Sequence, residues 1–503
     1  MKNGKIILKA TLWNTTPVGI GSGSDEHSDR DVVTTLYPIG PDCELLPAER
    51  IGEAKFFKRL PFIPATSFMG AIQRHFDTET FKEVENYWGE SEKNASFIDC
   101  SDILITHLLP HVEKGVLPTE IRDGIRLDSA KGTVAKGAKF DYELLAPNTT
   151  FGLTMIFRVE TAKKYDEKSN KEIEVVLTDY QSSLNIASSI AHIINNGFDL
   201  GAKTTVGFGR MKGRADLFEL DFENPKEFQK WINNESGRPI KAGIPHYLKP
   251  KENFFEIEAT FKIKNSLIIR SYSKDPDAPD STHLKSGGKN ILSGSSIKGA
   301  LRGRAERILN TIQSDKSKTQ IILEGLFGDM EKEDDGVTVK PHGYTVPSRV
   351  FVDEIPIDEV KEETQTRIQI DRFTGGTVDG ALIEEVSLFP DKEKEQIRNF
   401  RIRIEMNPEA KSVLPLDKGL MLLLLKDLWT EDLPIGGEKS IGRGVLTGVD
   451  ATITDGQEMY HLMEDFNVPA KVEKLQTYVT ALNELADFEL YENRVLNYKS
   501  KKK

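Results

Sequence analysis

Three short motifs occur twice in this sequence of 503 residues, and both sets run in the same order at similar separations. The pairs are 63–72 with 292–303, 125–138 with 368–381, and 201–210 with 436–445. The first pair shares small hydroxylated residues followed by Gly-Ala, and the third is rich in glycine. Chance could produce one such pair but not three in register, so the chain is a duplication and should fold as two similar modules.

Length and composition limit the class of protein. A chain of this length is too long for one hydrophobic core, and 38% hydrophobic with 29% charged residues is ordinary for a globular protein. It contains no run of about 18 apolar residues, as a membrane-spanning helix needs. We expect no secretory signal, and the two cysteines, Cys43 and Cys100, indicate neither a disulfide scaffold nor a thiolate metal site. We expect a cytoplasmic protein with no membrane partner.

The distribution of charge indicates an anionic ligand. The net charge of -12 argues at first against nucleic acid. However, residues 285–307 contain six Lys or Arg and one Glu, and residues 199–214 contain four Lys or Arg and one Asp. Acidic residues gather instead in 324–335 and 353–363. Because the repeated motifs are basic, they are the expected binding regions.

The segment 292–303 predicts the start of an amphipathic helix with a serine N-cap. Lys298 and Arg302 lie one turn apart on this helix, and a helix N-terminus favours phosphate. The alternative is an ordinary capped helix with a solvated basic face. The first copy has Met69 and Gln73 at the two basic positions, so its grip on an anion is weaker.

Periodicity predicts the remaining elements. Alternating apolar residues predict strands at 6–12 and 255–263. Residues 122–151, rich in glycine and lysine, are interpreted as a protruding hairpin. We therefore expect an α+β fold of two tandem ferredoxin-like modules with hairpins and a short helical tail. The expected boundaries are 1–247 for module 1, 248–458 for module 2 with an acidic insertion at about 313–366, and 459–503 for a helical tail with a basic end.

The order of these motifs resembles the RAMP superfamily of CRISPR-associated proteins, and more narrowly the backbone subunits of type III effector complexes. The resemblance covers nearly the whole chain twice and implies a tandem fusion of two such subunits. In these RRM-like proteins a ferredoxin-like palm holds guide RNA and a hairpin thumb wedges between its bases. The implied partners are a CRISPR guide RNA, complementary target RNA and other effector-complex subunits.

The resemblance assigns RNA binding to the motif helices and the glycine-rich segments. Tight turns would also explain the glycines, but adjacent arginines favour close approach of the backbone to RNA phosphate. The predicted RNA-binding residues are Ser67, Ser296, Lys298, Arg302, Lys203, Gly207, Gly209, Arg210, Gly442, Arg443 and Gly444.

Subunits of this family that cut the target carry an aspartate between the first strand and the motif helix. Eight residues past Gly23 lies Asp31, and eight past Tyr272 lies Asp280, so the resemblance assigns catalysis to these two aspartates. A carboxylate can accept a 2′-hydroxyl proton or hold a divalent cation, Mg²⁺ or Mn²⁺, on the phosphate. Acidic residues in polar loops are usually solvated surface, and the nearest rivals are Asp25, Asp29 and Asp277.

Three functions follow as hypotheses: a metal-dependent endoribonuclease subunit with two sites, a purely structural guide-binding subunit, and a metal-independent guide-processing ribonuclease. The third needs a histidine-centred site. His27 and His283 lie in the two candidate loops, where solvated histidines are expected. The sequence has no His-x-x-x-His or Cys-x-x-Cys pair, so we predict no structural zinc site and no protein-only metal site.

Overall fold

The structure is a computed structural model, and its described residues form two compact units. Unit 1 comprises Met1–Leu127, Val134–Thr204 and Phe208–Lys249, and unit 2 comprises Asp128–Thr133, Thr205–Gly207 and Pro250–Lys503. The residues that the structure describes are 3–21, 32–40, 46, 48–89, 95–107, 118–127, 134–166, 171–249, 254–272, 277–328, 346–358, 360–391, 397–405, 411–463 and 472–500.

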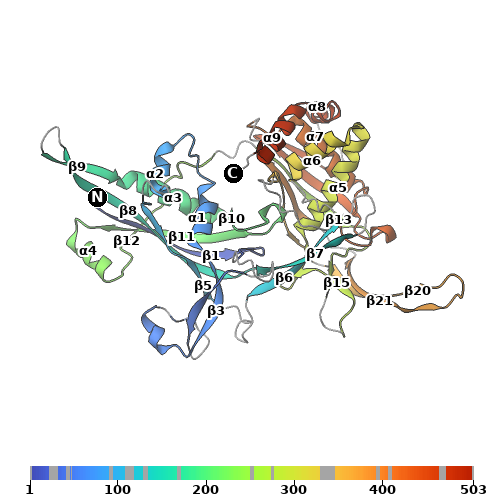
Figure 1. Ribbon diagram of the computed structural model, residues 1–503, viewed down its shortest axis with the longest axis horizontal. Coiled ribbons are helices and arrows are strands. Elements are labelled where there is room, and N and C mark those ends of the chain that lie inside the picture. Colours follow the sequence, from blue (N-terminus) through green and yellow to red (C-terminus); the bar gives the residue numbers. More distant parts are fainter. Residues whose placement is uncertain are drawn as a thin grey trace. The chain divides into compact units, whose positions relative to one another are not determined.

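Unit 1 is built on one large antiparallel sheet that contains β1 (Figure 1). β11 and β8 flank β1, and β5 lies beyond β8. This is the strand order of a ferredoxin-like fold, with α1 and α3 as the two crossing helices. The strands are β1 Gly4–Asn14, β2 Thr34–Ile39, β3 Phe56–Ile63, β4 Ile98–Cys100, β5 Ile103–His107, β8 Thr150–Asp166, β9 Lys171–Thr178, β10 Phe198–Asp199, β11 Arg210–Asp221 and β12 Arg238–Ile240. The helices are α1 Ala65–Gln73, α2 Glu85–Trp88, α3 Tyr180–Asn196 and α4 Pro225–Ile232.

Unit 2 repeats this order in its central sheet. β23 and β22 flank β13, and β18 lies beyond β22, with α5 and α7 as the crossing helices. The central strands are β13 Phe254–Ile263, β18 Val350–Val352, β22 Ile397–Glu405, β23 Leu446–Asp455 and β24 Glu458–Leu462. The smaller strands are β14 Arg270–Ser271, β15 Ser281–His283, β16 Lys285–Ser286, β17 Lys289–Leu292 and β19 Ile355–Pro356. The helices are α5 Gly294–Ile312, α6 Lys316–Phe327, α7 Pro415–Trp429, α8 Val472–Asn483 and α9 Phe488–Ser500.

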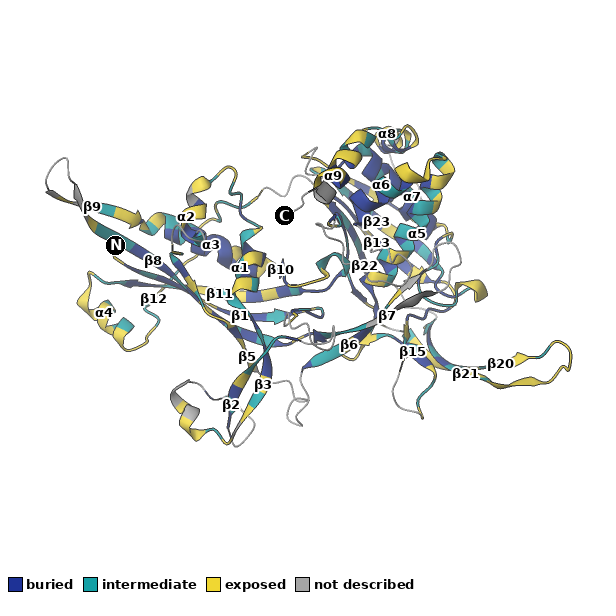
Figure 2. Cartoon of the chain, viewed as in Figure 1, coloured by how far each residue is buried: buried dark blue, intermediate teal, exposed yellow. Residues whose placement is uncertain are grey.

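The predicted amphipathic elements form the cores of the two units. On β13 the side chains of Phe255, Ile257 and Ala259 are buried, as the alternation predicts. α5 buries Ile297 and Leu301 one turn apart, so its apolar stripe covers the sheet. Figure 2 shows that buried residues gather in the sheets and in the helices that pack on them. The predicted α+β fold with ferredoxin-like units is therefore confirmed.

Each unit also carries a β-hairpin. In unit 1 it consists of β6 (Thr119–Leu127) and β7 (Val134–Leu145). In unit 2 it consists of β20 (Val360–Ile370) and β21 (Thr377–Pro390), which projects from the rest of the unit (Figure 1). The second motif pair falls on these two hairpins, as the resemblance implies.

The stretch of unit 2 that was expected to be an insertion is partly core. α6 and β18 lie inside the stretch interpreted as an acidic insertion, yet α6 buries Ile322, Leu323 and Leu326 in the core and β18 belongs to the central sheet. α6 begins with a polar turn, and acidic residues follow it in the sequence. Its short apolar run is therefore not recognisable as a core element from the sequence alone.

The predicted helical tail is part of the core of unit 2. β24 extends the central sheet, and Tyr491 of α9 is fully buried. The Tyr491 hydroxyl donates to Asp417, which also receives two hydrogen bonds of 2.8 Å from Arg349. Among the described helices, none combines the length and apolar character that crossing a lipid bilayer requires.

Candidate functional site

The motif helix of unit 2 begins as predicted. Ser293 is the N-cap, and its Oγ accepts a hydrogen bond from the Ser296 backbone N–H at 3.3 Å. Lys298 is largely enclosed, and its Nζ donates to Ser348 Oγ at 2.7 Å. Burial, together with the charge of Arg302, lowers the pKa of Lys298 to about 7. The lysine is therefore partly buried and hydrogen-bonded within the protein rather than fully solvated.

Arg302 also has partners within the protein. Its Nη1 donates to the carbonyl oxygens of Leu323 at 3.3 Å and Gly328 at 3.1 Å. Leu323 lies near the C-terminal end of α6 and Gly328 is its C-cap, where a cation interacts favourably with the helix dipole. The two basic residues thus stabilise the fold, and their contact with RNA stays a prediction.

The motif helix of unit 1 starts differently. Pro64 precedes α1, and a proline side chain cannot accept a hydrogen bond from the first turn. The Ala65 N–H instead donates to Asp102 Oδ1 at 2.8 Å. Ser67, the predicted RNA contact, lies in the same turn. A carboxylate at this position repels phosphate, so α1 offers a poorer anion site than α5.

The glycine-rich segments have the same geometry in both units. A Cβ on Gly209 would lie 2.0 Å from the Leu200 carbonyl oxygen, and one on Gly444 would lie 1.9 Å from that of Ile435. The matching backbone hydrogen bonds, from Leu200 N and Ile435 N, measure 2.8 and 2.9 Å. Both glycines have a positive φ, 78° and 76°. The close approach of the chain to itself therefore requires these glycines, whether or not RNA also binds there.

Residues around these glycines match one by one. Gly207 and Gly442 have φ values of 88° and 85°. Lys203 and Glu438 each adopt a left-handed conformation, with φ of 58° and 55°. Each segment is therefore one repeated loop, which differs in its side chains. Arg210, a predicted RNA contact, forms an ion pair with Asp199.

In unit 1 aromatic and cation–π contacts join the loop to the hairpin. Arg122 on β6 and Tyr142 on β7 are cross-strand partners. The Lys203 Nζ lies 3.6 Å from the centroid of the Tyr142 ring, and the Arg122 guanidinium lies 5.7 Å from that of Phe208. The Tyr142 and Phe208 rings are 6.0 Å apart. We call these four residues the aromatic junction.

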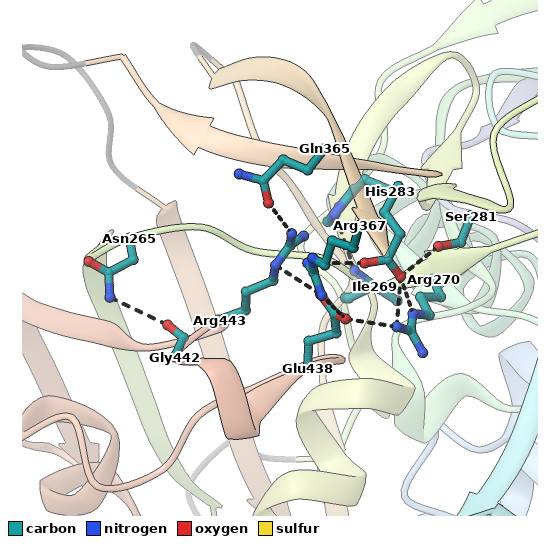
Figure 3. Close-up of polar contacts among 11 residues, drawn as sticks. Asn265, Ile269, Arg270, Ser281, His283, Gln365, Arg367, Glu438, Gly442 and Arg443 are labelled. Carbon is teal, nitrogen blue, oxygen red and sulfur yellow. Dashed lines mark hydrogen bonds and ion pairs between the residues drawn. The ribbon is translucent and has the colours of Figure 1, made fainter. Parts of the chain in front are cut away.

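In unit 2 ion pairs join the same two elements. Gln365 on β20 and Glu385 on β21 are cross-strand partners, and the loop supplies Glu438 and Arg443 (Figure 3). Counting from the repeated motifs, these four positions match Arg122, Tyr142, Lys203 and Phe208 in that order. We call Arg270, Arg367, Glu385, Glu438 and Arg443 the ion-pair cluster.

The contacts of the cluster are short and partly enclosed. Arg443 Nε lies 3.0 Å from Glu438 Oε2, and Arg443 Nη2 donates to Gln365. Arg367 Nη2 donates to Glu438 Oε2 at 2.6 Å. Burial acts to raise the pKa of Glu438, but the hydrogen bond from Arg367 and the charges of Arg443 and Arg367 lower that pKa overall. Glu438 is therefore ionised at neutral pH.

Asp280 lies at the base of the unit 2 hairpin. Its side chain is exposed, and its Oδ2 accepts a hydrogen bond from the Glu384 N–H of β21 at 2.8 Å. The next residue, Ser281, pairs with Glu385 in a parallel ladder. The rival Asp277 is exposed too. Asp280 is thus the candidate that the structure fixes next to the hairpin.

His283 corrects the expectation of a solvated loop histidine. It is 2% exposed, its Nδ1 accepts from the Ile269 N–H at 3.3 Å, and its Nε2 lies 2.9 Å from the Ile291 carbonyl oxygen. Burial lowers its pKa to about 4. A histidine with both ring nitrogens engaged inside the protein is not placed for proton transfer to a substrate.

The unit 1 loop offers two alignments. Asp31 lies outside the described residues, as do Asp25, Asp29 and His27. Gly21 forms an isolated β-bridge with Val32 in unit 1, and Arg270 pairs with His283 in unit 2. The segment between the paired residues is therefore two residues longer in unit 2. Counting forward from the first bridge partner matches Asp280 with Asp31, whereas counting back from the second matches it with Asp29.

Sequence reasoning missed the acidic members of the cluster, Glu385 and Glu438, together with Arg270 and Arg367. The motif pairs match residues 365 and 385 with 122 and 142 of unit 1, but the contact of these positions with the glycine-rich loop is seen only in the structure. Only Arg443 among the cluster was a predicted site residue, and it is buried.

A family model describing the RAMP superfamily matches residues 14–212 and 260–447, one match in each half of the chain. The two matches cover more than half of the sequence, and the chain belongs to the RAMP superfamily. This membership implies a CRISPR-associated, RNA-binding subunit. A search of curated proteins found no match.

Proposed function

We propose that this protein is a cytoplasmic backbone subunit of a type III CRISPR effector complex that binds guide RNA and cleaves complementary target RNA. The two family matches and the two hairpins support a pair of backbone-like modules. The observation that carries the cleavage proposal is the exposed carboxylate of Asp280, held by Glu384 at the base of a projecting hairpin. The unit 1 counterpart is Asp31. Asp29 is the alternative if the two loops are aligned from the second β-paired residue, Val32 with His283.

The chemistry asks little of the protein. The 2′-hydroxyl oxygen attacks the adjacent phosphorus, the P–O5′ bond breaks, and the products are a 2′,3′-cyclic phosphate and a 5′-hydroxyl. Asp280 can accept the 2′-hydroxyl proton, and a water molecule can give the leaving 5′-oxygen its proton. No group of three or more His, Cys, Asp or Glu that could hold a metal occurs among the described residues, so Asp280 would hold Mg²⁺ or Mn²⁺ together with RNA oxygens. Such a cation would neutralise charge on the scissile phosphate.

The test assembles the complex with guide RNA and end-labelled target in Mg²⁺ or Mn²⁺. Wild-type protein should give two cuts that depend on this chain, and Asp280→Ala should abolish one of them while target still binds. Asp277→Ala, an exposed neighbour in the same loop, is the matched control and should leave both cuts. A 2′-deoxy nucleotide on the 5′ side of one cut should block that cut only. Survival of both cuts in Asp280→Ala would remove Asp280 from the chemistry.

A second candidate function, a subunit in which only module 2 cuts RNA, is favoured by the weaker motif helix of module 1. Asp102 occupies the start of α1, and Met69 and Gln73 replace the basic pair of the other module. In this case Asp31→Ala and Asp29→Ala each leave the cleavage pattern unchanged, and the chain makes one cut. Guide processing without metal has less support, because His283 is buried. Cleavage that persists in excess chelator would favour it.

A further inference from the structure

The segment that carries Asp280 has little backbone support of its own. β15 is three residues long and pairs through two residues with β14 and through two with β21. Ladders of this size are not stable by themselves in water. Side chains must therefore hold the segment in place.

β21 supplies these contacts from two consecutive residues. The Glu384 N–H donates to Asp280 Oδ2 at 2.8 Å. The Glu385 side chain accepts a hydrogen bond from Ser281 Oγ at 3.1 Å and is 2% exposed. The hairpin strand thus holds both the candidate catalytic carboxylate and the residue that follows it.

Glu385 is in turn fixed by the cluster. Arg270 Nη2 lies 2.7 Å from Glu385 Oε1, and Arg367 Nη2 lies 3.2 Å from Glu385 Oε2. The same two arginines bind Glu438 of the glycine-rich loop. In Figure 3 Arg270, Arg367 and Arg443 converge on Glu438. The Asp280 segment, the hairpin and the glycine-rich loop therefore share one set of ion pairs.

We propose that Glu385 and Glu438 are positioning residues that hold the Asp280 segment against the hairpin, so that the RNA bound by the hairpin meets Asp280 in a fixed geometry. This inference rests on the proposed function of Asp280. Neither glutamate is exposed enough to serve as an RNA ligand, since their side chains are 2% and 13% exposed. They act through Ser281, Arg270 and the backbone of β21.

Charge balance explains why both carboxylates are needed. The cluster contains three guanidinium groups and two carboxylates, and Arg443 is 3% exposed. Replacing either glutamate by glutamine keeps the shape but leaves three cations facing one anion. Their repulsion is strong in a partly enclosed site, so the cluster should loosen and release the Asp280 segment.

The experiment compares Glu385→Gln and Glu438→Gln with Asp427→Asn in the assembled complex. Asp427 lies on α7 of the same unit, and its side chain is 7% exposed. It forms an ion pair of 2.6 Å with Arg304 Nε of α5. It is a matched loss of one enclosed carboxylate that does not touch the Asp280 segment. We would measure the single-turnover rate of the Asp280-dependent cut at saturating target, the target Kd, and hydrogen exchange of the amides of residues 281–284.

The two glutamine variants should lower this cut rate on the order of tenfold, because a small misplacement of a catalytic group costs rate rather than binding. Target Kd should stay within about twofold, exchange at residues 281–284 should rise, and Asp427→Asn should change none of these. An unchanged cut rate, or equal losses in Asp427→Asn, would overturn the proposal. If Asp280→Ala removes no cut, the proposed function fails instead. The exchange measurement then decides the positioning role alone, and unchanged exchange refutes it.

Discussion

The two units join hairpin to glycine-rich loop through the same four positions but with different chemistry. In unit 1 an arginine on the hairpin, Arg122, lies over Phe208 of the loop. In unit 2 the arginine is on the loop, and Arg443 donates to Gln365 on the hairpin. The backbone register is the same, so the duplication preserved the joint while the residue types changed. Such a joint needs a cross-strand pair facing a loop, but it does not need one particular kind of contact.

The difference has a consequence for robustness. In unit 1 the Lys203 contact is exposed and the Arg122–Phe208 contact is buried, and cation–π contacts contribute about 0.5–1 kcal/mol at exposed sites and about 2 kcal/mol when desolvated. An enclosed ion-pair cluster fails as a whole, because removal of one partner strands the others. Unit 2, which holds the described candidate aspartate, therefore has the joint that depends more on charge balance.

Exchanging the left-handed loop residue between the units should give the largest effect. Glu438→Lys leaves the cluster with four cations and one carboxylate and should destabilise unit 2 by roughly 3 kcal/mol. Lys203→Glu removes an exposed cation–π contact and should cost unit 1 less than about 1 kcal/mol. Denaturant unfolding followed by hydrogen exchange in peptides of each unit measures both. Equal losses in the two units would show that the joints do not differ in energy.

The stability of the two units should respond differently to low pH. At the β-paired position that precedes the motif helix, unit 2 has His283 and unit 1 has the buried Val32. The folded-state pKa of His283 is about 4, below its ordinary value of 6.5. The unfolded chain binds more protons between these values, so unit 2 should lose about 3 kcal/mol as pH falls from 6.5 to 4.

His283→Val should remove this pH dependence in unit 2. It should also lower stability at pH 7 by roughly 1–3 kcal/mol, because the Ile269 N–H and the Ile291 carbonyl lose their partner. The free energy of unfolding of unit 2 at pH 4 and pH 7 tests both statements. An acid dependence that survives in the variant would assign it to another group.

The smallest expected effect is the coupling between the hairpin and loop positions. Arg443→Phe should destabilise unit 2, and adding Gln365→Arg should recover about 1 kcal/mol, since the new pair recreates the cation over an aromatic ring seen in unit 1. A double-mutant cycle in unfolding free energy measures this term. Additive effects would mean that the matched register does not transfer the contact.

The sequence predicted the duplicated fold because its signals are local and periodic. Apolar alternation marked β13, the spacing of Ile297 and Leu301 marked α5, and the glycine- and lysine-rich stretch marked the unit 1 hairpin. The Ser293 cap followed from residue type and position. These features depend on neighbours in the chain, which is why one sequence suffices to predict them.

The candidate site was less predictable because its decisive contacts are distant in the sequence. Glu385 and Glu438 look like ordinary surface acids until the fold brings Arg270 and Arg367 against them. Likewise the sequence around Lys298 is also typical of a solvated lysine on a helix surface. Its partial burial and its hydrogen bond to Ser348 are seen only in the structure. A buried charge carries no local mark of its burial, so such clusters are found in the structure rather than in the pattern.

The last helix of unit 2 sets an order for folding during synthesis. Arg349 and Asp417 bind each other 68 residues apart, and the Tyr491 hydroxyl completes their hydrogen bonds from α9. A chain leaves the ribosome from its N-terminus, so unit 1 is complete long before this tyrosine emerges. Until then the half-finished unit 2 exposes the apolar faces that α8 and α9 will cover, and it is the part of the nascent chain that chaperones would guard.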